Sequence, residues 1–135
     1  MRKRRRSTPR SRDEMANYLF RILIYYLKHE VNRISWVRDL RDPECHSIIL
    51  NGMNSKLNGH CAIYLHADLQ TEPYKALKIL VHETFHSLSS MDTHAEEEWF
   101  VRRFTSYFWR KSTDKQKLFL LKFLPGFAVF SPQPR

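Results

Sequence analysis

The fold is decided by the stretch KILVHETFH at residues 78–86, where apolar side chains recur at helical spacing. Pro73 precedes this stretch at a position typical of a first helical turn, so we expect a helix to run through it. His82 and His86 are four residues apart, which places both imidazoles on one face of that helix. Glu83 lies on the neighbouring helical row, within reach of a water molecule held by a metal ion between the histidines.

The pattern H-E-x-x-H is typical of zinc hydrolases, since two imidazoles on one helical face can bind a single metal ion. Zinc acidifies a bound water and polarises a carbonyl, while a carboxylate takes the proton and later delivers it to a leaving amine. The spacing therefore predicts a zinc-dependent endopeptidase that acts on a protein or peptide substrate. We expect His82 and His86 to bind one zinc ion (Zn2+) and Glu83 to act as general base.

A catalytic zinc site needs a third protein ligand and an open fourth position. We expect another helix from the capping box of Thr93 and Glu96 to about Arg110. On this helix Glu98 shares a face with mainly apolar side chains, at Ala95, Val101, Phe104, Thr105 and Phe108. A carboxylate on a buried face needs a partner, which a zinc ion supplies. Glu98 is therefore the predicted third ligand, whereas Glu97 is predicted to point toward solvent.

Alternatives to this ligand set stay open. Glu98 could instead form a buried ion pair with a nearby arginine. His94 could be the third ligand, could stabilise the oxyanion of the reaction, or could be a surface histidine at a helix start. Cys45-His46 and His60-Cys61 could form a second metal set, but adjacent residues on a strand point to opposite faces. Two buried structural cysteines are the favoured interpretation of Cys45 and Cys61.

The remaining pattern predicts an α+β fold, a helix-rich single domain with a small antiparallel sheet packed beside the helix that carries HETFH. Residues 13–31 have the helical spacing of a buried scaffold helix. Residues 46–50 and 61–65 are short β-prone runs that we expect to pair with each other. A last helix is expected from Ser112 or Thr113 through Leu124, where Pro125-Gly126 stops it.

The charge of the chain is concentrated at its start. The formal net charge is +9, but residues 1–12 hold seven basic and no acidic side chains, which leaves 16 basic and 14 acidic residues in the remainder. We expect residues 1–12 to be a disordered arm, with possible nucleic acid contact through residues 2–12, and residues 127–135 to be a tail.

We expect a cytoplasmic protein. The chain has only two cysteines, no convincing secretory signal and no apolar run long enough to span a membrane.

The order of these parts resembles the ImmA/IrrE family of small zinc metallopeptidases. The resemblance extends over Gly59–Trp109 and consists of the strand GHCAIYL, the stretch KILVHETFH and the downstream frame Glu98-x-x-Val101-x-x-Phe104-Thr105. The chain departs from the family pattern at Phe85, Val101 and Arg102, none of which is an expected ligand.

The resemblance implies a zincin-like metallopeptidase domain over residues 13–126, with a small antiparallel sheet beside the zinc helix. It also implies His82, His86 and Glu98 as ligands and Glu83 as the catalytic carboxylate. Members of the family cleave transcriptional repressors, and other members are associated with toxins or phages.

Two other functions compete with the peptidase. In the first, zinc only stabilises a regulatory binding module whose basic arm contacts nucleic acid. In the second, the apolar run Leu118–Phe130 docks a partner that gates the enzyme, although the same run could simply complete the core. A carboxylate at Glu83 favours the enzyme, because a purely structural zinc site does not need it.

Overall fold

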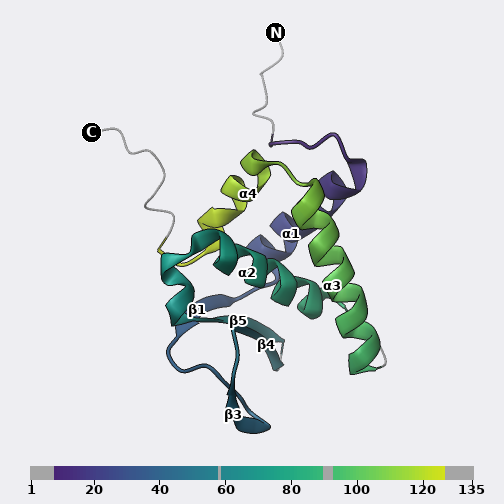
Figure 1. Cartoon of the computed structure of the whole chain (residues 1–135). Coiled ribbons are helices and arrows are strands. Elements are labelled where there is room, and N and C mark those ends of the chain that lie inside the picture. The colour runs from purple at the N-terminus through teal and green to yellow at the C-terminus, as the bar shows by residue number, and fades with distance from the viewer. Residues whose placement is uncertain (1–7, 58, 90–92, 127–135) are drawn as a thin grey trace, which may run out of the picture.

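The α-helices gather on one side of a small sheet in the computed structural model, which describes residues 8–57, 59–89 and 93–126 (Figure 1). The result is the α+β class expected from the sequence. The elements follow in the order α1 (Glu14–His29), β1 (Arg33–Val37), β2 (Arg41–Asp42), β3 (Cys45–Ile49), β4 (Gly52–Leu57), β5 (His60–His66), a 3-10 helix (Ala67–Thr71), α2 (Pro73–Leu88), α3 (His94–Lys111), α4 (Asp114–Leu120) and a 3-10 helix (Leu121–Phe123).

The predicted helices form close to their expected limits, and side-chain caps mark their starts. Asp13 accepts a hydrogen bond from the backbone N–H of Ala16 at 2.9 Å and so begins α1. Thr93 caps α3 through the N–H of Glu96, as the capping box predicted. Thr113 caps α4 in the same way, but the last segment is shorter as an α-helix than expected and ends in a 3-10 turn.

The predicted pairing of residues 46–50 with 61–65 is wrong. β3 instead pairs with β2, and β5 lies between β1 and β4 in a three-stranded sheet of order β1-β5-β4. β4 is antiparallel to β5, as expected of a short chain reversal, but β1 is parallel to it, so the sheet is mixed. Residues 53–57, expected to be a connection, form most of β4 and take the place beside β5.

β4 runs along α2 and contacts it with every second residue. A Cβ atom at Gly52 would lie 2.5 Å from Cγ2 of Ile79, so only glycine allows this approach without a shift. Asn54 donates to the side chain of Glu83, and Lys56 donates to the backbone carbonyl of Ser87 at 2.8 Å. The polar residues of β4 therefore face the polar side of α2.

The core lies between the sheet, α1, α2 and α3. α2 is its central element and contributes Ala76, Leu77, Leu80, Val81 and Phe85 to one buried apolar cluster. The alternating residues Cys61, Ile63 and Leu65 of β5 are buried beneath α2. The hairpin of β2 and β3 extends away from the helices, and every residue of β3 is exposed (Figure 1).

The two cysteines differ from the expectation that both are buried. Cys61 is buried, whereas Cys45 lies on β3 and is exposed, because the hairpin extends away from the helices (Figure 1). Both are free thiols. They do not form a second metal set with His46 and His60, since the described residues bring together a single group that could hold a metal ion, and it contains none of these four.

The start of the described chain is attached to the helices. Ser11 donates from its hydroxyl to the carbonyl of Lys111 at 2.6 Å, and the carbonyl of Pro9 accepts from Gln116. Residues 9–11, part of the arm expected to be disordered, are therefore held beside the end of α3. The predictions for residues 1–7 and 127–135 lie outside the described residues. In the part of the chain that the structure covers, no helix combines the length and the apolar character needed to cross a membrane.

Candidate metal centre

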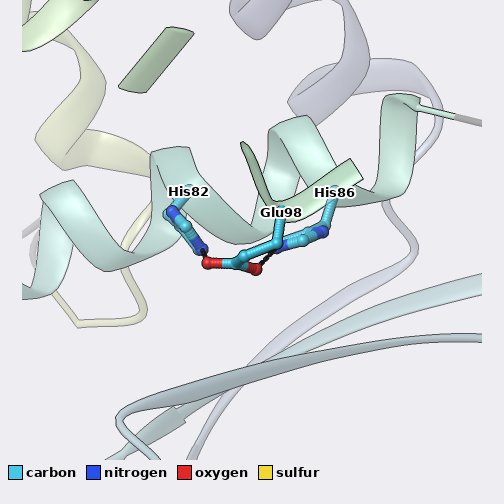
Figure 2. A group of neighbouring side chains, drawn as sticks. All are labelled: His82, His86 and Glu98. Carbon is cyan, nitrogen blue, oxygen red and sulfur yellow. Dashed lines mark hydrogen bonds and ion pairs between the residues drawn. The ribbon is translucent and has the colours of Figure 1, made fainter. Parts of the chain in front are cut away.

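The predicted ligands come together between α2 and α3. Nε2 of His86 lies 2.8 Å from Oε1 of Glu98, and Nε2 of His82 lies 3.6 Å from Oε2 of the same carboxylate. Figure 2 shows the carboxylate between the two imidazole rings, with one oxygen toward each. The helical spacing of the histidines and the inward face of Glu98 thus lead to the convergence that the sequence predicted.

The geometry and chemistry of this group suit a shared metal ion. One ligand atom from each of His82, His86 and Glu98 lies within 4.8 Å of the others. Ligand atoms about 2.1 Å from a common zinc ion would lie about 3.4 Å apart in a tetrahedral site, which small side-chain rotations can reach from here. Two imidazoles and one carboxylate are also a donor set typical of catalytic zinc. The group could therefore hold a metal ion.

The protonation states favour metal binding. Burial lowers the pKa of His82, helped by the nearby charge of His86, so that its imidazole is neutral at pH 7, the form that binds metals. Burial acts to raise the pKa of Glu98, but the hydrogen bond from Arg102 and the charges of His82 and His86 outweigh it and leave the pKa lowered. Glu98 is therefore ionised, the form in which a carboxylate binds a metal ion.

Arg102 is a second partner of Glu98. Its Nε donates to Oε2 of Glu98 at 2.6 Å, one helical turn further along α3. The ion pair considered as an alternative to metal binding is thus present, but the arginine side chain is 74% exposed. Because the same carboxylate also faces both histidines, Arg102 orients the Glu98 carboxylate without closing it off from them.

Glu97 contacts the site, contrary to the prediction that it points toward solvent. Its Oε1 lies 3.0 Å from Nδ1 of His86, and its Oε2 accepts a hydrogen bond from Ser89 at 2.5 Å. The bond from Ser89 lowers the pKa of Glu97, with a smaller contribution from His86. The first turn of α3 faces the end of α2, which brings Glu97 onto the outer nitrogen of His86. A carboxylate in this position fixes the ring and the tautomer of a ligand histidine.

Glu83 lies beside the ligands and is held by the neighbouring strand. Asn54 of β4 donates from its side-chain amide to Oε1 of Glu83 at 3.0 Å. Burial raises the pKa of Glu83, although the bond from Asn54 works in the opposite direction. Sequence reasoning missed Asn54 and Gly52. The sequence carried no clear signal for them, since residues 52–57 lack the regular apolar alternation that is typical of a half-buried strand.

His94 is next to the site but not part of the ligand group. Its ring stacks on that of His86 with centroids 6.4 Å apart and an angle of 7° between the planes. The residue is exposed at the start of α3. Of the alternatives for His94, the ligand role has no support among the described contacts.

Comparisons of this chain with protein-family models, with curated proteins and with solved structures find no match. Assignment to the ImmA/IrrE family accordingly stays a prediction from the motif residues.

Proposed function

We propose that this protein is a zinc-dependent endopeptidase. The observation that carries the proposal is the convergence of the Glu98 carboxylate on both histidines of HETFH, with Glu83 held beside them by Asn54. His82, His86 and Glu98 would hold the zinc ion. When bound, zinc supplies a Lewis acid that lowers the pKa of a water molecule and polarises a substrate carbonyl.

Glu83 is suited to move the proton in this reaction. Hydrolysis forms a bond between the water oxygen and the carbonyl carbon and breaks the C–N bond, so one proton must travel from water to the amine nitrogen. The half-buried carboxylate of Glu83 takes that proton and delivers it to the amine, and a raised pKa suits both steps near neutral pH. Asn54 keeps one carboxylate oxygen in place and leaves the other for the proton.

The sheet offers a place for an extended substrate beside Glu83. Among the described strands β4 is at the edge of the sheet order β1-β5-β4, so its outer backbone groups can pair with an added strand. Asn54 on β4 is hydrogen-bonded to the Glu83 side chain, and a Cβ atom at Gly52 would lie 3.1 Å from Cγ of Glu83. A polypeptide paired with this edge would lie close to the proposed general base.

The free thiols of Cys45 and Cys61 suit a cytoplasmic location.

The test is cleavage of a proteome-derived peptide mixture by the zinc-loaded protein, with new N-termini read by mass spectrometry. Glu83→Gln should lower the rate of cleavage by about 10²–10⁴-fold while the zinc content is unchanged. Glu96→Gln, an exposed glutamate on α3, is the matched control and should cleave like the wild type. Full activity of Glu83→Gln, or no cleavage by the wild type, would refute the proposal.

A further inference from the structure

A basic groove runs along the outer face of α3, where the start of α1 lies against it. Its volume is about 630 Å³. Three arginines, Arg102, Arg103 and Arg110, line it together with Met15 and Phe104, and none of its lining residues is acidic. Such a surface attracts a partner that carries negative charge.

Aromatic side chains hold two of these arginines in place. The guanidinium of Arg103 lies 4.6 Å from the ring centroid of Trp99, and that of Arg110 lies 5.8 Å from the ring centroid of Tyr107. Within the described residues neither Arg103 nor Arg110 forms an ion pair with a carboxylate. Their planar donor groups are therefore ordered and available to a carboxylate from outside.

The floor of the groove is apolar and continues around α3. Met15 is 48% exposed and Phe104 is 40% exposed, although both are large apolar side chains. Both also line a second groove of about 410 Å³ between α1 and α3, whose other walls include Tyr18, Leu88 and Phe100. The arginines thus border a continuous apolar surface that a partner with apolar side chains can cover.

The basic groove extends from the candidate metal group to the start of the described chain. At one end Arg102 donates to the ligand Glu98. At the other end Ser11 is bonded to Lys111, which holds Arg10 and Arg12 next to the end of α3. The helical distance from Trp99 to Arg110 is roughly 16 Å, enough for about five residues of an extended chain.

We propose that this groove docks an acidic and partly apolar segment of the polypeptide substrate. The inference rests on the proposed function only where it calls the docked partner a substrate, because the docking contacts do not involve the metal ion. Carboxylates of the segment pair with Arg103 and Arg110, and its apolar side chains cover Met15 and Phe104. A chain bound in this way leads past Arg102 toward Glu98 and the scissile-bond position.

A nucleic acid suits the same charge less well. Single strands bind by stacking their bases on open aromatic faces. Here the guanidinium groups of Arg103 and Arg110 each lie over one ring face, of Trp99 and Tyr107, and so occupy faces on which a base could stack, although Trp99 is 54% exposed. The continuous apolar floor at Met15 and Phe104 also matches leucine or phenylalanine side chains better than a sugar–phosphate backbone. The observations therefore favour a polypeptide.

The experiment is fluorescence anisotropy with a fluorescein-labelled peptide of about ten residues in which glutamate and leucine alternate. The full-length protein carries Glu83→Gln so that the probe is not cut. Replacing Arg103 and Arg110 together by glutamine should weaken binding about tenfold. The charge-matched control replaces the exposed Lys75 and Lys115 by glutamine and should change the affinity less than about twofold.

A second probe tests the same point without altering the protein. The peptide with glutamine in place of every glutamate should bind about tenfold more weakly or not at all. Equal binding of the two peptides, equal binding by the arginine variant, or no binding would overturn the proposal. So would a single-stranded oligothymidylate that binds more tightly than the peptide through the same arginines.

The two proposals can fail separately. Charge-dependent peptide binding by a protein that cleaves nothing would refute the peptidase and leave the docking surface intact. Cleavage that depends on Glu83, combined with no effect of Arg103 and Arg110 on peptide binding, would refute only the docking surface.

Discussion

On one face of α2, the side chains of Leu77, Leu80 and Val81 are fully buried in the apolar core. On the other face, His82 and Glu83 are partly exposed and make polar contacts with α3 and β4. The first face stabilises the fold by removing apolar area from water. The second face holds ionisable groups, whose partial burial lowers the stability of the fold. Substitutions on the two faces should therefore separate stability from function.

The largest effect is expected on the apolar face. Leu80 is 0% exposed, so Leu80→Ala removes buried methyl groups and leaves a cavity at the centre of the core. The free energy of unfolding should fall by about 2–5 kcal/mol, measured by urea denaturation of the metal-free protein. Lys75→Ala on the exposed side of the same helix should change it by less than about 0.5 kcal/mol. A small loss for Leu80→Ala would mean that α2 does not form the core.

An intermediate effect is expected where the polar face meets α3. Glu97→Ala removes the carboxylate beside Nδ1 of His86 and should weaken zinc binding about 10–100-fold. Competition with a chromophoric chelator measures this affinity. The neighbouring Glu96→Ala, whose side chain is exposed, provides the comparison and should bind zinc like the wild type. If both substitutions weaken binding equally, the general negative charge of α3 matters and the contact with His86 does not.

The smallest effect should have the opposite sign. Because burial raises the pKa of Glu83 above its usual value of 4.5, the folded protein holds this proton more tightly than the unfolded chain does. The wild type therefore loses stability as the pH rises from 4.5 through the raised folded pKa, whereas a glutamine at this position does not titrate.

Thermal unfolding with a chelator present should consequently show that Glu83→Gln is more stable than the wild type at pH values above the raised pKa of Glu83. The advantage should shrink as the pH falls below 4.5, where the wild-type carboxyl becomes protonated in both states. A variant that is less stable at every pH would show that the carboxylate is a net stabilising group of the metal-free fold.

The helices and the ligand group could be predicted because their signals are local. The spacing of His82 and His86 and the apolar frame around Glu98 depend only on helical geometry, which the sequence carries within a few turns. The rotation that brings α3 against the end of α2 is a tertiary property. Because of this rotation, Glu97 contacts His86 instead of pointing toward solvent as predicted.

The sheet was harder to predict because strand pairing is not local. Residues 52–57 lack an apolar alternation, since Gly52, Asn54 and Lys56 face the polar side of α2. Without that alternation the sequence predicts a connection over residues 53–57 and a pairing of residues 46–50 with residues 61–65, whereas β4 lies beside β5. The missing strand is also why Asn54 did not enter the predicted site.

The central claim is that His82, His86 and Glu98 bind one zinc ion, and the metal content of the purified protein tests it most directly. The wild type should contain about one zinc ion per chain, and Glu98→Ala should have lost it. Arg102→Ala, which removes only the other partner of Glu98, should keep the zinc. Stoichiometric zinc in Glu98→Ala, or its absence from the wild type after zinc loading, would contradict the account.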